Sequence, residues 1–147
     1  MNVLSIDSFR GYYFFLSNFS SSKIQYKGYT YPNGEAAFQA QKNDSHTYKH
    51  LMQFQTPKSA KKEGRHVNLR SDWEQVKDQL MYEIVLAKFS QNEELKRRLL
   101  ATGTKKLIEG NTWHDNHYGN CTCTKCKNIE GKNVLGKAFM KVREELK

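Results

Sequence analysis

Two carboxylates flank a tryptophan in residues 109 to 115, which read Glu-Gly-Asn-Thr-Trp-His-Asp. Glu109 and Asp115 could serve as general acid, general base or charge stabiliser, and loops held by rigid helices are where such groups concentrate. The same residues also suit a capped turn, because Asn and Asp bond their own backbone, Gly supplies positive φ and Trp113 can anchor the loop in the core. Taken alone, the segment favours the capped turn.

Glu35 is a third acidic candidate. On a helix, Glu35, Gln39 and Lys42 are spaced i, i+4 and i+7 and therefore lie along one face. This face could be a solvated stripe, with Glu35 stabilised at the helix start by the helix dipole. Alternatively, Glu35 faces a cleft. The pattern leaves both interpretations open.

Trp73, Lys77 and Met81 form a further set at i, i+4 and i+8, preceded by Arg70. A flat indole beside a cation could hold a base while the cation meets phosphate. Equally, Lys77 could lay its aliphatic stem on Trp73 at the surface.

The three cysteines of the chain are clustered at Cys121, Cys123 and Cys126, just after His114 and His117. An odd number in one short segment excludes a disulfide framework and fits a reducing compartment. Structural zinc sites use four ligands, commonly in CxxC pairs, and one such pair is present here. Three cysteines with His117 could bind zinc. Because a second CxxC or an HxxxH is lacking, the favoured interpretation is reduced thiols in a surface insertion.

Length and composition indicate one domain spanning residues 1–147. Eight Phe, eight Tyr and two Trp supply buried area and exclude a disordered chain. The net charge of +9 attracts anions without choosing among nucleotides, sugar phosphates and nucleic acid. No apolar run approaches the roughly 20 residues that cross a bilayer, and the segment after Met1 does not resemble a secretory leader, so we expect a soluble cytoplasmic protein.

Common catalytic and nucleotide-binding motifs are absent from the sequence. It contains no GxGxxG, no P-loop, no HExxH and no nucleophile elbow. Nucleotide handling by the commonest folds is therefore unsupported. Three clustered thiols also favour metal or redox chemistry over one activated nucleophile.

The first third of the chain predicts short strands. The aromatic run Tyr12 to Phe15 fits a strand, and alternating apolar residues from Ile24 to Tyr31 predict a hairpin that turns at Lys27 and Gly28. A short strand is also predicted from Lys105 to Ile108, and an irregular polar stretch from Glu109 to Lys132.

Helices account for most of the remaining sequence. Helix starts are predicted at Asn33, at Ser45, at the pair Thr56 and Pro57, at the capping-box pair Ser71 and Glu74, and at Asn92. A last helix is predicted through residues 134–142. Gly64 and Gly103 are predicted helix stops, and the helix from Ser71 should run to about Phe89. The predicted fold class is α+β, predominantly helical, a single compact domain with short strands near the amino terminus.

Several blocks together resemble one known family. The sequence is similar to the NADAR family, which includes N-glycosidase-like proteins linked to riboflavin biosynthesis, over about residues 9 to 146. The matching blocks are Phe15–Phe19, Tyr31–Lys42, Leu69–Trp73, Glu109–Asp115 and Gly131–Gly136. One departure is Tyr118, where members of the family often carry an aromatic residue such as Trp before the glycine.

The resemblance implies hydrolysis of a bond between ribose C1 and a nitrogen. The implied substrates are phosphorylated ribosylamino-pyrimidine intermediates or ADP-ribose linked to guanine, with ADP-ribosylated nucleic acid as a further partner. All of these substrates are anionic, and the positive net charge of the protein favours binding of anions. The reaction passes through an oxocarbenium-like state that a carboxylate stabilises while a second acid or base serves the leaving nitrogen or the water. We expect no metal or cofactor in it.

The resemblance also assigns candidate residues. Glu35 and Asp115 are the expected catalytic pair, with Glu109 in reserve. The expected substrate contacts fall into three groups. The aromatic residues Trp73 and Trp113 are expected to contact the base, and the cations Arg70, Lys77 and Lys42 the phosphate oxygens. The amides of Asn18 and Asn133 are expected to bond ribose hydroxyls or to cap turns.

Two other classes of function compete with the glycosidase. The basic charge and the aromatics interleaved with Lys also fit a non-catalytic nucleotide or nucleic-acid binding module. The cysteine cluster fits a small zinc-stabilised interaction module. The sequence does not indicate an oligomeric state.

Overall fold

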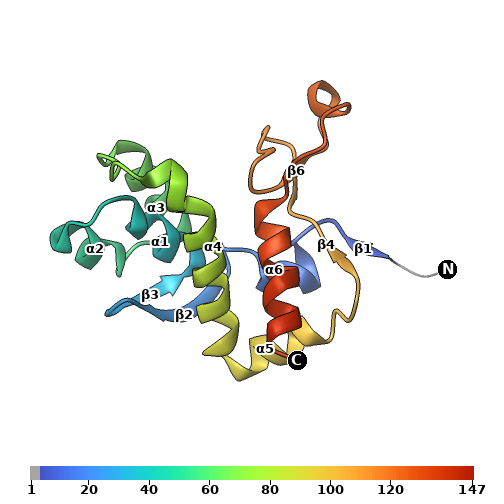
Figure 1. The fold of residues 1–147 in the computed structure, drawn as a ribbon, viewed down its shortest axis with the longest axis horizontal. Helices are drawn as coiled ribbons and strands as arrows, with labels where there is room; N and C mark the ends of the chain where they lie inside the picture. Colours follow the sequence, from blue (N-terminus) through green and yellow to red (C-terminus); the bar gives the residue numbers. More distant parts are fainter. Residues whose placement is uncertain (1–3) are drawn as a thin grey trace.

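The computed structural model describes residues 4–147. Two long helices, α4 (Trp73–Ser90) and α6 (Val134–Glu145), pack against each other through the middle of the molecule (Figure 1). The other helical segments are α1 (Gly34–Gln39), α2 (His46–Met52), α3 (Pro57–His66), α5 (Glu93–Leu100) and the 3-10 turns η1 (Gly11–Leu16), η2 (Ala40–Lys42) and η3 (Thr124–Cys126). The strands are β1 (Ser5–Ile6), β2 (Ser21–Tyr26), β3 (Tyr29–Asn33), β4 (Lys106–Leu107), β5 (Gly110–Asn111) and β6 (Asn120–Cys121). The predicted α+β class, predominantly helical, is confirmed.

The predicted hairpin is present as β2 and β3. The strands pair antiparallel, with Tyr26 opposite Tyr29. Lys27 and Gly28 both have positive φ, at 49° and 89°, as a tight two-residue turn between twisted strands requires. The Gln91 side chain, just after α4, bonds the backbone of Gln25 in both directions and so ties the hairpin to the long helix.

Side-chain caps start the three short helices at the predicted residues. Asn33 accepts from the backbone of Ala36, Ser45 from Tyr48 and Thr56 from Ser59. These bonds satisfy N–H groups that lack a partner within the helix. Gly64 was predicted to end α3, but the helix continues to His66 and Gly64 is buried inside it.

Two further predictions of local structure were wrong. The aromatic run from Tyr12 to Phe15 is not a strand but part of η1, which buries Phe15 and Leu16 and leaves Tyr12 exposed. Gly11 precedes the run with φ of 57°, so the chain turns there. Ser71 does not cap α4 either: the residue at the N-cap is Asp72, which makes no side-chain cap bond.

The centre of the core is an aromatic cluster beside α4 and α6. Phe139 of α6 packs edge-on against Phe9 and Phe89, with ring centroids 5.4 and 5.8 Å apart. Phe89 and Phe139 are fully buried. Such side chains contribute about 1.5–3 kcal/mol each through burial. The cluster attaches the segment around Phe9 to the two long helices.

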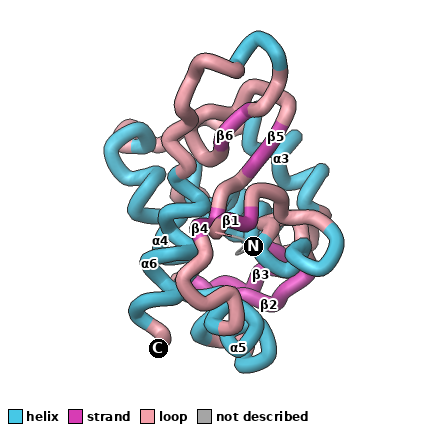
Figure 2. Tube along the Cα trace, turned by 90° about the vertical axis from the view of Figure 1, so that its right-hand side faces the viewer, coloured by secondary structure: helices cyan, strands magenta, loops and turns pink. Residues whose placement is uncertain are grey.

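Two short parallel pairings were not predicted. Strand β1 pairs with β4, and β5 pairs with β6. The two pairings form a column that extends into a projecting arm, which is the segment from β5 to the start of α6 (Figure 2). The first pairing places the segment after β1 beside the segment after β4. Among residues 4–147, no helix is both long and apolar enough to cross a membrane.

Candidate active site

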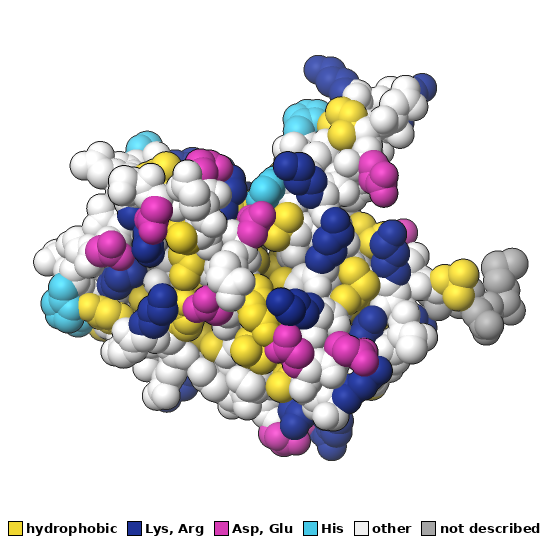
Figure 3. Space-filling model, viewed as in Figure 1, with side chains coloured by type: hydrophobic (Ala, Val, Ile, Leu, Met, Phe, Trp, Pro, Cys, Tyr) yellow, Lys and Arg dark blue, Asp and Glu magenta, His cyan; other side chains and the backbone are white. Residues whose placement is uncertain are grey.

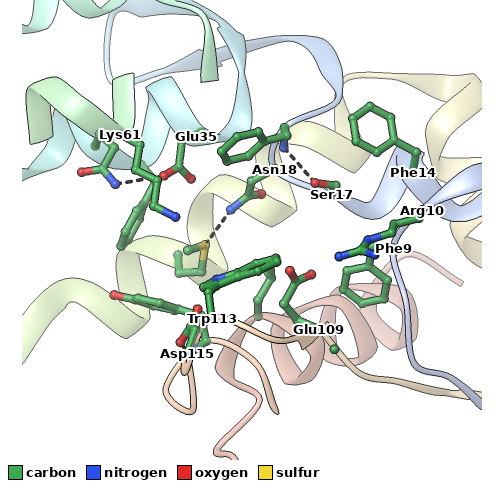
Figure 4. Close-up of a pocket in the computed structure, with 17 residues that line it drawn as sticks. Phe9, Arg10, Phe14, Ser17, Asn18, Glu35, Lys61, Glu109, Trp113 and Asp115 are labelled. Atoms are coloured by element: carbon green, nitrogen blue, oxygen red, sulfur yellow. Dashed lines mark hydrogen bonds between the residues drawn. The ribbon is translucent and has the colours of Figure 1, made fainter. Parts of the chain in front are cut away.

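A cavity of about 320 Å³ lies where η1, α1, α3 and the segment after β4 meet. Its size suits a small ligand. Three carboxyl groups line it, from Glu35, Glu109 and Asp115. Figure 4 shows these acids around one space, with Arg10 and Lys61 also directed toward it. The other lining side chains are largely aromatic and include Phe9, Phe14, Phe19, Phe38, Trp113 and Tyr118.

Glu35 lies in the first turn of α1 and is only 9% exposed. Its Oε1 accepts a hydrogen bond from Gln39 Nε2 at 3.0 Å, one helical turn away. Burial raises the pKa of Glu35, against the opposing effects of this bond and of the Lys61 and Lys42 charges. Gln39 is buried as well. The face that carries Glu35 and Gln39 is therefore the cleft-facing one, not a solvated stripe.

Glu109 reaches the cavity from the segment after β4. Its backbone N–H donates to Asn133 Oδ1 at 2.9 Å, and Asn133 Nδ2 donates to the carbonyl of Leu107 at 2.8 Å. Burial raises the pKa of Glu109 to about 7, and the negative charge of Asp115 adds to the rise. Glu109 can therefore gain or lose a proton near neutral pH.

Asp115 is held by its own turn. Its Oδ1 accepts from the backbone N–H of His117 at 3.1 Å and of Tyr118 at 2.9 Å. The Asn111 side chain bonds the Asp115 backbone in both directions. The capped turn that the sequence favoured is thus real, and it presents the carboxylate to the cavity.

Trp113 and Asn18 also line the cavity. Trp113 is 52% exposed, so it does not anchor the loop in the core. The Lys61 ammonium lies 6.0 Å from its ring centroid. Asn18 is buried, and its Nδ2 lies 3.5 Å from the sulfur of Met81. Trp113 thus offers an open aromatic face, and Asn18 a polar group set among apolar ones.

The two cations at the cavity were not singled out from the sequence. Arg10 directly precedes η1, and Lys61 lies on the second turn of α3. Neither belongs to a motif block, and lysines are common throughout the chain. Both lie near carboxyl groups, since Arg10 lowers the pKa of Glu109 and Lys61 lowers that of Glu35 and Glu109. Because their positions depend on contacts between distant segments, spacing along the chain did not reveal them.

Several expected substrate contacts lie outside the cavity lining. Trp73 is 6% exposed and packs behind Phe38, with ring centroids 5.3 Å apart. Arg70 forms a two-bond ion pair with Asp72, at 2.6 and 3.1 Å, and a longer one with Asp44. Trp73 therefore supports a cavity residue from behind, and the guanidinium of Arg70 is paired with carboxylates.

Lys77, Lys42 and Asn133 are also not among the residues that line the cavity. Lys77 pairs with Glu74 at 2.6 Å, and Lys42 donates to the carbonyl of Gly64 at 3.2 Å. Lys42 follows α1 at the end of the 3-10 turn η2, where its charge acts on Glu35 although its side chain does not line the cavity. Asn133, with φ of 53°, uses its side-chain amide to hold the backbone around Glu109. Its observed contacts therefore position a cavity residue.

A second group of ligating side chains lies in the arm, outside the cavity lining. The side chains of His114, Cys121, Cys123 and Cys126 converge there. His117, expected beside the cysteines, instead places Nε2 at 2.8 Å from Asp78 Oδ1. The histidine nearest the thiols is therefore His114, three residues earlier.

Comparison with known proteins identifies the family and agrees with this fold. The NADAR domain matches residues 8–147. N-glycosidase YbiA of Escherichia coli is 39% identical over 133 residues, covering 88% of this chain and 79% of that protein. An N-glycosidase of Nostoc punctiforme is 36% identical over 137 residues, covering 89% and 84%. A riboflavin biosynthesis protein of Vibrio vulnificus is 33% identical, covering 90% of this chain and 35% of that protein.

A solved structure shares the whole architecture. The NMR structure of E. coli YbiA superposes with a TM-score of 0.81 at 36% identity, covering 99% of this chain and 87% of that one. Several curated relatives are named N-glycosidases, and together they support a hydrolase acting on N-glycosyl compounds. The family match spans nearly the full chain, and the chain therefore belongs to the NADAR family.

Proposed function

We propose that the cavity is the active site and that it hydrolyses the bond between ribose C1 and a base nitrogen. The substrate class is a phosphorylated ribosyl compound, either a ribosylaminopyrimidine phosphate or ADP-ribose attached to guanine. The observation that supports this proposal is the meeting of three carboxyl groups, two cations and aromatic walls in one cavity.

Each part of the cavity has a role in this reaction. As the C1–N bond breaks, positive charge develops at C1 and a nearby carboxylate stabilises it. We assign this role to Asp115, whose orientation two backbone N–H groups maintain. The leaving nitrogen takes a proton, and a carboxyl group with a raised pKa supplies it most readily.

Glu35 and Glu109 are the two groups with raised pKa. We assign proton transfer to Glu35, as the family resemblance implies, with Glu109 as the group that shares or replaces it. Water then attacks C1, and the carboxyl group that gave its proton to the leaving nitrogen takes up the proton that the water loses. The products are a free hydroxyl at C1 and a protonated base nitrogen. The balance needs no metal and no cofactor.

The remaining lining groups would bind the rest of the substrate. Arg10 and Lys61, which line the cavity, would meet phosphate oxygens, in the role that the family resemblance had implied for Arg70, Lys77 and Lys42. Trp113 would stack on the base, since half of its surface is open. Asn18 would bond a ribose hydroxyl.

Mass spectrometry of reaction products tests the function directly. The purified protein is incubated in H₂¹⁸O with ADP-ribosylated guanosine, ADP-ribose, NAD and a ribosylaminopyrimidine phosphate. We expect release of the base from the first or the last, with one ¹⁸O in the ribose product. Turnover of none of the four would overturn the proposal.

A binding module without catalysis is the second candidate, and the net charge of +9 favours it. On the face shown in Figure 3, Lys and Arg side chains are interleaved with Asp and Glu and do not form one continuous patch. Affinity that falls steeply with salt, without product, would identify this function.

A further inference from the structure

His114, Cys121, Cys123 and Cys126 bring their ligand atoms within 4.8 Å of one another. His114 Nδ1 lies 3.4 Å from the sulfur of Cys123, 3.5 Å from that of Cys126 and 3.9 Å from that of Cys121. A tetrahedral zinc ion with sulfur ligands at about 2.3 Å and nitrogen at about 2.0–2.1 Å separates nitrogen from sulfur by about 3.5–3.6 Å and sulfur from sulfur by about 3.8 Å. The three nitrogen–sulfur separations lie within about 0.4 Å of such an edge, so small shifts of the side chains would bring the four ligand atoms around one ion.

We infer that these four side chains bind one Zn²⁺ ion in a structural site. Three thiolates and one imidazole are a donor set that zinc favours over magnesium or calcium. Four protein ligands leave no open position for water, so the ion would stabilise structure and take no part in catalysis. Binding converts each thiol to a thiolate and releases its proton to solvent. None of the four ligands lines the cavity.

The fold of the arm explains how the ligands meet. The pairing of β5 with β6 sets Asn111 beside Cys121, which brings the turn after Asn111 to the cysteines. The turn η3 then folds the CxxC pair back, with the Cys126 N–H donating to the Cys123 carbonyl at 3.0 Å. Asn116 links the two parts, accepting from the Cys121 N–H at 2.9 Å and lying 3.5 Å from the Cys126 sulfur.

Burial and backbone geometry at the cluster also point to an ion. Cys121 and Cys126 are buried, although the arm projects from the body of the molecule (Figure 1). His114 has φ of 69°, a left-handed conformation that is unfavourable for a residue with a side chain. A bond from His114 to zinc would offset this cost and would hold the exposed imidazole toward the sulfurs.

The site would also stabilise the cavity wall. His114 lies between Trp113 and Asp115, both of which line the cavity, while its own ring points to the cysteines. A metal bound there would fasten this segment to the loop of residues 121–126. Loss of the metal should therefore loosen the wall without unfolding the helical core.

Metal analysis is the first test. The full chain is purified under reducing conditions without chelator, and its zinc content is measured by inductively coupled plasma mass spectrometry. We expect about one ion per chain, and Co²⁺ in its place should give the visible bands of tetrahedral thiolate coordination. Less than about half an equivalent after reconstitution with excess Zn²⁺, together with no cobalt–thiolate band, would overturn the inference.

Two variants and a matched control identify the ligands. His114→Ala and Cys123→Ser change the two ligands that are not buried, so the core should remain folded. Each should weaken Co²⁺ affinity by at least about 100-fold. His117→Asn removes the neighbouring histidine, which contacts Asp78, and should leave metal affinity unchanged. Metal lost in His117→Asn but retained in His114→Ala would refute the proposed ligand set.

Hydrogen exchange separates this inference from the proposed function. Removing zinc with a chelator should increase amide exchange in residues 111–126 by about 10-fold or more and leave α4 unchanged. This readout does not depend on any substrate. If zinc binds but exchange in residues 111–126 does not change, the ion does not stabilise the cavity wall and that part of the inference fails.

Discussion

The side-chain amide of Gln39 donates to Glu35 across one turn of α1, and the other end of that amide lies against Gly64 of α3. Among the described residues, Gln39 Oε1 is buried and has no hydrogen-bond partner. The packing of two helices thus determines the orientation of the amide that bonds the buried acid.

This relationship predicts the effect of Gly64→Ala. A Cβ at this position would lie 1.9 Å from Gln39 Oε1 and 2.6 Å from its Cδ, so Gln39 must move and Glu35 loses its donor. Because that bond lowers the pKa of Glu35, the pKa should rise further. Turnover should fall about 10-fold, because the carboxyl group is no longer held in position by Gln39. Steady-state kinetics measures the change. Lys62→Ala, an exposed position on α3, is the control, and an equal loss there would contradict the argument.

Removing the charge of Glu35 tests its role in proton transfer. Glu35→Gln keeps the size of the side chain and should lower kcat by at least about 100-fold while thermal unfolding changes little. Glu93→Gln, in the exposed first turn of α5, should be neutral. Full activity in Glu35→Gln would transfer the role to Glu109.

The raised pKa of Glu109 predicts how activity and stability depend on pH. With a pKa of about 7, Glu109 should contribute a limb near pH 7 to the profile of kcat/KM, and Glu109→Gln should remove it. The folded state holds this proton more tightly than the unfolded state. The free energy of unfolding should therefore fall by about 1–3 kcal/mol as pH rises from about 4.5 to 7. Urea unfolding at several pH values checks this, and an unchanged slope in Glu109→Gln would contradict it.

Arg10 should bind substrate without taking part in bond cleavage. Arg10→Met removes a cation at the cavity and should raise KM about 10-fold with little change in kcat, because phosphate binding contributes equally to the ground and transition states. Arg97→Met, at an exposed ion pair on α5, is the control. A fall in kcat with unchanged KM would place Arg10 at the reacting atoms instead.

Lys88 predicts a second pH effect, of opposite sign. It is fully buried, donates to the Ser17 carbonyl at 3.1 Å and the Ser20 hydroxyl at 3.2 Å, and burial lowers its pKa to about 7. The unfolded state binds this proton more tightly, so stability should rise as pH increases from about 7 to 10. In Lys88→Met this rise should be absent, as measured by urea unfolding across that range. A rise that persists in the variant would show that other groups cause it.

The sequence by itself determined the elements whose signals are local. The caps at Asn33, Ser45 and Thr56 and the turn at Lys27 and Gly28 formed where predicted, because each depends on bonds or φ angles within a few residues. Where the local signal was ambiguous, as in the aromatic run before Leu16, packing of Phe15 into the core decided the conformation.

Only the tertiary structure decided which side chains share a site. The parallel pairings of β1 with β4 and of β5 with β6 join segments far apart in the chain, and no pattern within one segment specifies them. Through these pairings Arg10 comes near Glu109, and His114, not His117, comes to the cysteines. Such contacts depend on loop closure and packing summed over the whole chain, so residue spacing alone does not reveal them.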